Sequence, residues 1–338
     1  MFGPPHVEPV AFLSPRVVYV VTGALRGIGA ELVRQLAGAC LSPVVIVAGG
    51  RCVEKGKQLQ ERCRSQSQNA QVVFVPLELR EPACVAAFVD RVLADFGVPD
   101  VLVNNAGLCL DAPSMDALEQ CVRVNADAPS ELIEAFLPLM LRRGSGRVVN
   151  ISSGDGEIAY FASDALSVLT VPRKMSSSES YAGPELDVRQ LYEQARRFFF
   201  DSARRHGGDV SAELVHGTQP CYKVSKALLN LFSRALIYEL EARRSSSVAK
   251  AKDSATSSPG ELAAAEGLER IQIYCVCPGD VDTDMANDVD QLLDAGSSLL
   301  SCAESVSRFL ELVLVPPAQS CKPPPPCGFY RDGKRIAW

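Results

Sequence analysis

The chain has 338 residues, of which 47% are hydrophobic and 22% charged, so it can bury the core of one large domain. Its net charge of -6 gives no basic footprint, and we expect no nucleic-acid partner. No apolar run reaches about 18 residues, the length that would indicate a membrane span. Residues 1–15 also lack the basic start and apolar stretch of a secretory signal. We therefore predict a cytoplasmic protein without a membrane partner.

Twelve cysteines are scattered along the chain without a C-x-x-C pair, and only three histidines accompany them. This spacing predicts no metal site. Scattered thiols without a secretory signal also favour a reducing compartment. Cys221 directly precedes Tyr222, and we hypothesise that it makes a site there sensitive to thiol-modifying reagents.

A glycine-rich turn lies near the start of the chain. Residues 17–21 are an apolar, β-branched run that predicts a buried strand. They lead into Thr22-Gly23-Ala24-Leu25-Arg26-Gly27-Ile28-Gly29, and a helical pattern follows. A strand, a glycine turn and a helix form the setting in which backbone N–H groups bind a pyrophosphate. A tight strand-to-helix connection without a ligand is the alternative.

The second predicted strand, residues 44–47, is followed by Gly49-Gly50-Arg51. In a dinucleotide-binding fold, an acidic residue here would hold the ribose 2′-hydroxyl, but the first acid is Glu54. Arg51 and Arg26 could instead bind a 2′-phosphate, which favours NADP over NAD. The alternative is two solvated surface arginines. We expect the two glycines to lengthen the turn before Arg51.

Further strands and helices alternate along the chain. Strands are predicted at 72–75, 101–103, 147–151 and 271–276, and helices at 83–96 and 118–141. This alternation predicts an α/β fold, a Rossmann-type doubly wound parallel sheet with helices on both faces. Polar or turn residues follow three of the later strands, at 104–107, 152–154 and 278–279. Because ligands bind outside the carboxyl ends of such strands, these motifs should converge.

Tyr222 and Lys226 lie four residues apart at the start of an apolar helical run. A helix places such a pair on one face, so the phenol and the ammonium can share a pocket. A phenol beside a fixed cation ionises more easily and becomes a usable acid or base.

Together, these motifs resemble the short-chain dehydrogenase/reductase family over about residues 15–338. The matching elements are Thr22-Gly23-x-x-x-Gly27-Ile28-Gly29, Asn104-Asn105-Ala106-Gly107, Asn125, Ser153, Tyr222-x-x-x-Lys226 and Pro278-Gly279 with Thr283. Within the family, the chain looks most like the carbonyl reductases. Three features support this: the segment 51–56, a long insertion before Tyr222, and the ending 328–338. That subgroup is mostly monomeric and NADPH-dependent.

The resemblance implies four catalytic residues. Tyr222 would be the general acid that protonates the carbonyl oxygen. Lys226 would lower the pKa of the phenol and hold the nicotinamide ribose. Ser153 would hydrogen-bond the substrate carbonyl and stabilise developing oxyanion charge. Asn125 would fix a water molecule that links Lys226 to solvent.

The resemblance also implies a set of cofactor-binding residues. These are Thr22, Gly23, Leu25, Arg26, Gly27, Ile28, Gly29, Arg51, Glu78, Leu79, Asn104, Asn105, Ala106, Gly107, Tyr222, Lys226, Pro278, Gly279, Val281 and Thr283. Glu78 stands where the family usually has an aspartate near the adenine.

We predict one domain, residues 15–338, after an N-terminal extension, residues 1–14. An insertion at about 154–218 should contain a polar loop at 173–180 and an amphipathic helix from Leu186 to Arg205. In the related subgroup such a helix covers an oligomerisation surface, which implies a monomer; a surface helix without that role is the alternative. A second insertion, at about 244–268, is low in complexity and expected to be disordered. Residues 280–293 are expected to cap the substrate.

These observations predict an oxidoreductase that uses NADPH to reduce the carbonyl of a ketone, aldehyde or quinone, a small-molecule substrate, to an alcohol. One alternative is a dedicated dehydrogenase for a steroid, terpenoid or alkaloid alcohol. Another is a catalytically idle NADP-binding sensor or scaffold, since fold alone does not settle function. The intact set of Asn125, Ser153, Tyr222 and Lys226 argues against the idle protein.

Overall fold

An eight-stranded sheet forms the centre of the computed structural model, in the order β3-β2-β1-β4-β5-β6-β7-β8. The structure describes residues 16–65, 67–171, 187–211, 214–253, 267–283, 285, 299–315 and 324–338. The strands are β1 (Val17–Thr22), β2 (Val44–Gly50), β3 (Ala70–Pro76), β4 (Val101–Asn104), β5 (Gly146–Ile151), β6 (Ile271–Cys277), β7 (Gly328–Arg331) and β8 (Lys334–Ile336). All pairings are parallel except that of β7 with β8. The predicted parallel sheet is confirmed, and the C-terminal ending adds two strands to it.

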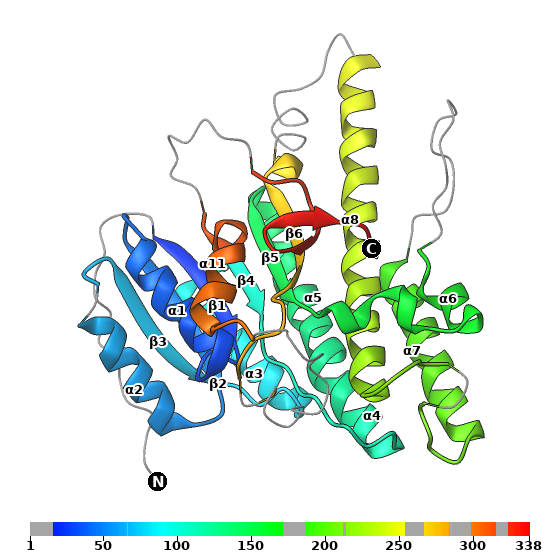
Figure 1. The fold of residues 1–338 in the computed structure, drawn as a ribbon. Coiled ribbons are helices and arrows are strands. Elements are labelled where there is room, and N and C mark those ends of the chain that lie inside the picture. Colours follow the sequence, from blue (N-terminus) through cyan, green and yellow to red (C-terminus); the bar gives the residue numbers. More distant parts are fainter. Residues whose placement is uncertain are drawn as a thin grey trace.

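Helices cover both faces of the sheet (Figure 1). They are α1 (Gly27–Ala39), α2 (Val53–Arg64), α3 (Pro82–Phe96), α4 (Met115–Val122), α5 (Ala128–Arg143), α6 (Ser163–Leu169), α7 (Val188–Arg205), α8 (Pro220–Asp253) and α11 (Cys302–Val313). Side chains of α1, α2 and α11 pack in one core, and those of α3, α5 and α8 pack in the other. Helices α4, α6 and α7 pack against α8.

The side chains of β1 alternate between these two cores. Tyr19 and Val21 face α1 and α11, whereas Val18 and Val20 face the opposite layer. All four are buried, as expected for a central parallel strand with both faces covered. Because both faces of β1 are covered, the run at residues 17–21 is apolar throughout and does not alternate with polar residues.

The predicted helix 118–141 is present, but it is divided into three parts. Helix α4 ends at Val122, a π-helical turn η1 follows at Arg123–Asp127, and α5 continues to Arg143. Asn125 lies in the middle of η1. Apolar periodicity predicts helical structure but does not reveal one wide turn within it.

Gly49 and Gly50 belong to strand β2 and do not lengthen the turn before Arg51, so that prediction is wrong. A Cβ on Gly50 would lie 2.6 Å from the Leu25 side chain, and one on Gly49 would lie 3.0 Å from Leu77. The glycines therefore allow close side-chain packing on the strand.

The insertion before Tyr222 contains α7, which confirms the helix predicted there. The loop predicted at 173–180 lies outside the described residues, as does most of the expected substrate cap at 280–293.

The second insertion differs from its prediction, because α8 runs for 34 residues to Asp253 and projects beyond the sheet (Figure 1). Its part from 244 to 253 is helical, and 254–266 lie outside the described residues. The helical part has no glycine or proline, and extending an existing helix avoids the cost of nucleation. The Ser245 and Ser247 hydroxyls also donate to carbonyls one turn earlier.

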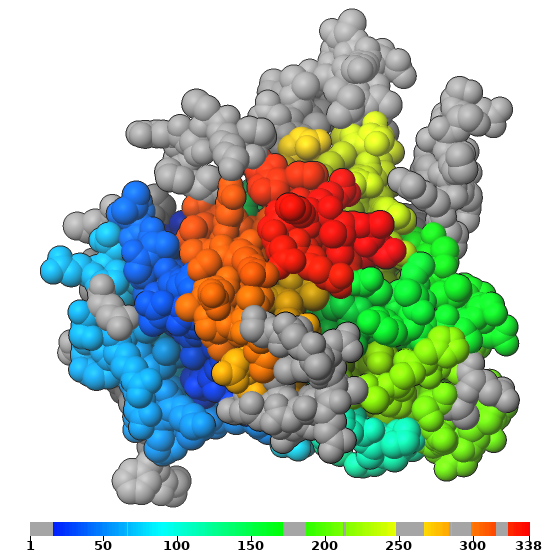
Figure 2. Space-filling view, viewed as in Figure 1, coloured from blue at the N-terminus to red at the C-terminus, as the bar shows by residue number. Residues whose placement is uncertain are grey.

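In Figure 2, the surface of segments 300–315 and 324–338 (orange and red) lies between that of the N-terminal part (blue) and that of the 150–170 region (green). Helix α11 packs on α1, and Arg331 of β7 forms an ion pair with Glu157. Within the part of the chain that the structure describes, no helix is both long enough and apolar enough to cross a bilayer.

Candidate active site

The glycine turn exposes the N-terminus of α1. The helix begins at Gly27, its first turn contains no acidic residue, and the Arg26 side chain does not cap it. Gly23 has φ 64°, and a Cβ on Gly29 would lie 2.3 Å from the Gly23 carbonyl oxygen. Only glycine fits these two positions, and the result is a set of backbone donors suited to an anion.

A groove of about 730 Å³ lies beside this turn. Many of the residues expected at the cofactor site line it: Gly23, Leu25, Arg26, Gly27, Ile28, Gly29, Arg51, Glu78, Leu79, Asn105, Ala106, Gly107 and Thr283. They come from the ends of β1, β2, β3 and β4 and from the segment after β6. The structure thus brings together motifs that are up to about 260 residues apart, as the carboxyl ends of parallel strands should.

Other residues expected there do not line the groove. Thr22 is buried, and its hydroxyl accepts the N–H groups of Asn105 (3.0 Å) and Ala106 (3.1 Å). Asn104 is also buried, and its amide donates to Asn150 at 2.8 Å. These two side chains support the lining from behind. Pro278, Gly279 and Val281 likewise lie outside the groove lining.

The groove also includes residues that sequence analysis missed: Gly50, Cys52, Lys55, Leu77, Arg80, Leu108, Gln120, Val124, Asp282, Met285 and Cys302. Lys55 and Arg80 join Arg26 and Arg51 in making one end basic. The sequence could have indicated Lys55 and Arg80, because these cations follow closely after the second and third strands, where ligands bind in such a sheet.

Glu78 is the one acid among the groove residues at this basic end. It accepts from Arg80 at 3.0 and 3.2 Å and lies 3.6 Å from Arg51. The hydrogen bond from Arg80 is the main reason that the pKa of Glu78 is lowered, so the carboxylate stays ionised. A phosphate placed here would share the two arginines with Glu78.

Tyr222 and Lys226 lie in the first turns of α8, outside the groove lining but next to it at Gly107. The Lys226 Nζ lies 5.6 Å from the centroid of the Tyr222 ring and donates to the Ile151 carbonyl at 2.9 Å. A Cβ on Gly107 would be 3.8 Å from that Nζ and 3.6 Å from Oδ1 of Asn125. The loop after β4, the π-turn and α8 therefore meet at one point.

The pKa values of this pair are shifted mainly by desolvation. Desolvation raises the pKa of Tyr222, and the charge of Asp155 raises it further, while a hydrogen bond with Ser153 partly offsets both. Desolvation lowers the pKa of Lys226 to about 8. The easier ionisation predicted for the phenol is therefore wrong for this structure. At neutral pH Tyr222 keeps its proton, the state that a general acid needs.

Ser153 follows β5 and bonds twice to Asp155. Its Oγ donates to the carboxylate at 3.1 Å and accepts the Asp155 N–H at 3.1 Å. Sequence analysis did not select Asp155, although it lies two residues after Ser153. Its carboxylate also raises the pKa of Lys226, together with three nearby thiols. The centre therefore contains a negative charge in addition to the four predicted side chains.

Asn125 is fully buried and has all its polar atoms bonded. Its Oδ1 accepts the Leu108 N–H at 2.8 Å, and its Nδ2 donates to the Leu108 carbonyl at 2.7 Å and to Ser225 Oγ at 2.8 Å. Ser225 in turn donates to the Tyr222 carbonyl. The side chain thus links the loop after β4 to the start of α8, and its role toward a water molecule stays a prediction.

Comparison with known proteins shows which family the chain resembles. A family model described as short chain dehydrogenase matches residues 17–166. The (+)-neomenthol dehydrogenase of Arabidopsis thaliana is 26% identical over 96% of this chain and 98% of its own length. The chain is thus similar to the short-chain dehydrogenase/reductase family of oxidoreductases, with the family model matching residues 17–166.

Solved structures of the family share the fold. The salutaridine reductase of Papaver somniferum has a TM-score of 0.66 at 22% identity, with 94% of this chain and all of that chain covered. An NADPH-bound carbonyl reductase from chicken fatty liver has a TM-score of 0.58 at 22% identity, with 96% of each chain covered. At this identity the similarity establishes the architecture of the family but not the substrate.

The thiol beside Tyr222 is not the reactive group that we hypothesised. Cys221 is fully buried, and its Sγ donates to the Ala112 carbonyl at 3.3 Å. Burial raises the pKa of the thiol to about 12, so almost none of it is thiolate at neutral pH.

Proposed function

We propose that this protein reduces the carbonyl group of a small molecule to an alcohol, using NADPH. The observation that carries the proposal is the convergence of Tyr222, Lys226 and Ser153 beside Gly107, which lines the groove. Tyr222 holds its proton and delivers it to the carbonyl oxygen. Lys226, charged below about pH 8, stabilises the phenolate that remains. Ser153 orients the carbonyl.

The groove fits a dinucleotide with a 2′-phosphate. Cβ atoms at Gly23 and Gly29 would collide with Ala106 and with the Gly23 carbonyl, so the two glycines let the turn pack tightly. The N-terminus of α1 has no side-chain cap and no acid in its first turn, which suits a pyrophosphate there. Arg26, Arg51 and Lys55 would hold the 2′-phosphate at the basic end. When bound, NADPH supplies the hydride.

A dedicated alcohol dehydrogenase is the second candidate. Its support is the similarity, over nearly the whole chain, to proteins named (+)-neomenthol dehydrogenase and salutaridine reductase. Both candidates use the same residues, and they differ in which alcohol or carbonyl compound fits the site.

The test is the consumption of NADPH, followed optically, with a panel of quinones, diketones, aldehydes and ketones that includes terpenoid and alkaloid carbonyls. Turnover that vanishes in Tyr222→Phe would support the reductase and its acid. Turnover confined to one terpenoid or alkaloid would favour the dedicated enzyme. Cofactor binding without turnover on any carbonyl would contradict both and favour the idle sensor.

We also propose that the protein is a monomer. Helix α7 packs against α8 and α4 and so occupies a surface that another subunit could otherwise use. Light scattering coupled to size-exclusion chromatography should give the mass of one chain, 36.3 kDa, and a dimer mass would contradict the proposal.

A further inference from the structure

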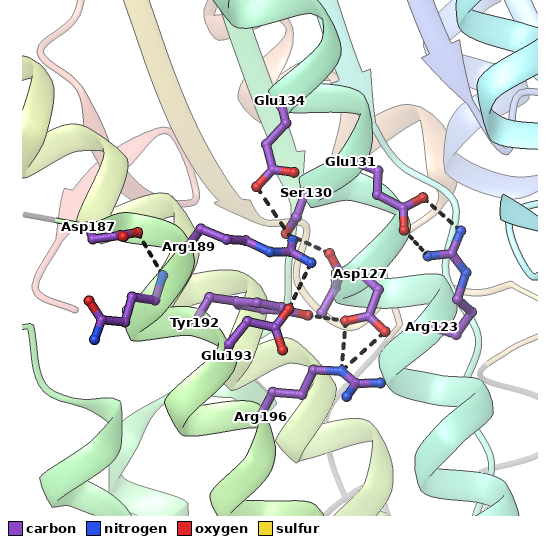
Figure 3. A network of polar contacts seen from close by, with 12 residues as sticks. Arg123, Asp127, Ser130, Glu131, Glu134, Asp187, Arg189, Tyr192, Glu193 and Arg196 are labelled. Carbon is purple, nitrogen blue, oxygen red and sulfur yellow. Dashed lines mark hydrogen bonds and ion pairs between the residues drawn. The ribbon is translucent and has the colours of Figure 1, made fainter.

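The insertion helix α7 is bonded directly to the π-turn that contains Asn125. We infer that Tyr192 and Arg196 of α7, acting through Asp127, are positioning residues that hold Asn125 in place. This inference rests on the proposed function, because it gives α7 a part in the geometry of the same site. Figure 3 shows the contacts that carry it.

The π-turn needs support because its wide geometry is rare in helices and concentrates at functional sites. The Ala128 N–H donates to the Arg123 carbonyl, five residues earlier. The Ser130 hydroxyl donates to the Ala126 carbonyl at 2.8 Å. A regular α-helix would place Asn125 on a different side, so the wide turn decides where its amide points.

Ion pairs with neighbouring side chains bind both ends of the turn. At the first end, Arg123 forms a two-point pair with Glu131 of α5, at 2.5 and 2.9 Å. At the last end, Asp127 accepts the Tyr192 hydroxyl at 2.5 Å and the Arg196 Nε at 3.1 and 3.3 Å. The first pair is local in sequence, but the second reaches more than sixty residues along the chain.

The second contact is well placed to resist movement. Tyr192 and Arg196 are four residues apart on α7, so both reach Asp127 from one face. Tyr192 is fully buried against Phe232 of α8, with ring centroids 5.6 Å apart. Burial raises the pKa of Tyr192 well above its usual value, so it remains a hydrogen-bond donor. Charge-assisted bonds in such surroundings are stronger than exposed ones.

Asn125 is two residues from Asp127, and its amide bonds span two other elements. It pairs with both backbone groups of Leu108 and with Ser225, the neighbour of Lys226. Displacement of Asp127 would therefore move an amide that joins the groove to the catalytic lysine. Errors of about 1 Å in such centres can cost about 100-fold in rate.

The experiment compares Asp127→Asn, Arg196→Gln and Tyr192→Phe with a matched control, Arg189→Gln. Arg189 also lies on α7, where it pairs with Glu134 of α5 at 3.4 Å and lies over the Tyr192 ring, 5.5 Å from its centroid. The bonds to Asp127 come from Tyr192 and Arg196, so Arg189→Gln leaves them in place. We expect kcat to fall about 10-fold in Asp127→Asn and Arg196→Gln, with KM for NADPH unchanged and a smaller fall in Tyr192→Phe. The double variant Asp127→Asn/Arg196→Gln should lose little more kcat than either single variant, because both substitutions remove the same contact between Asp127 and Arg196.

A second measurement does not depend on activity. The Leu108 amide donates to Asn125 Oδ1, so its hydrogen-exchange rate reports whether Asn125 stays in place. We expect this rate to rise about 10-fold in Asp127→Asn and to be unchanged in Arg189→Gln. Equal falls in kcat from Arg196→Gln and Arg189→Gln would contradict the inference, because they would show that α7 does not act on the site through Asp127. Unchanged Leu108 exchange in Asp127→Asn would overturn the inference, whereas a wild-type protein without carbonyl turnover would overturn only the proposed function.

Discussion

The cofactor groove and the catalytic centre are built in opposite ways. The groove relies on backbone atoms of the glycine turn and on several cations, of which Arg51 is 64% exposed. The centre relies on single buried side chains from η1, the end of β5 and α8, such as Asn125 and Lys226. Shared, solvated charges can replace one another, whereas a single buried group has no substitute. Loss of one residue should therefore be tolerated in the basic end of the groove and not in the centre.

The largest effect should come from Tyr222→Phe. The variant keeps the ring but removes the proton donor, so kcat should fall about 1,000-fold. NADPH affinity, measured by fluorescence titration, should change less than about twofold, because the groove is lined by other residues. Parallel losses of affinity and rate would show that the two regions are not separable in this way.

The substitution Gly29→Ala should disrupt the glycine turn, the part of the groove that depends on backbone atoms. A Cβ there would lie 2.3 Å from Gly23 O and 2.4 Å from Asn105 Nδ2, so the turn must move. NADPH affinity should fall about 100-fold, the loss expected when a backbone cradle for phosphate is displaced. Gly38→Ala is the matched control, since nothing lies within 4 Å of its Cβ position on the same helix. Equal affinity in both variants would contradict the fit of a pyrophosphate at the turn.

The pH dependence tests the electrostatics of the centre. Lys226 has a pKa lowered to about 8, mainly by desolvation, so it loses its charge as the pH rises through that value. The kcat/KM for carbonyl reduction should therefore be highest below pH 8 and fall above it. Asp155 raises the pKa of Lys226, so in Asp155→Asn the fall should begin at a lower pH. Glu157→Gln is the control, because Glu157 pairs with Arg331 instead. A fall that moves to higher pH in Asp155→Asn would contradict this account.

The smallest effect should come from Arg51→Ala. Its charge is exposed and shared with Arg26, Lys55 and Arg80. The KM for NADPH should rise about fivefold, close to the 1 kcal/mol typical of exposed pairs, with KM for NADH unchanged. An equal rise for NADH would show that Arg51 does not contact a 2′-phosphate.

Much of the fold was predictable because it depends on local patterns. Apolar runs such as residues 17–21 and 271–276 predicted the strands β1 to β6, since buried parallel strands are continuously apolar. The short ending 328–338 was noted only as a family feature, yet it forms β7 and β8. Strand β4 is equally short but was predicted from its apolar run at residues 101–103, whereas the sequences GFYR and KRI of β7 and β8 contain no such run.

The sequence by itself determined the glycine turn, the order of the polar strand ends, and the identity and spacing of Asn125, Ser153, Tyr222 and Lys226. These features follow from residue type and local spacing, which any sequence displays directly.

Only the tertiary structure decided the raised pKa of Tyr222, the place of Gly49 and Gly50 within a strand, and the bond of α7 to Asp127. Each of these depends on burial or on contacts between residues far apart in the chain. Desolvation and close packing are properties of the assembled core, and a spacing of residues along one segment does not contain them.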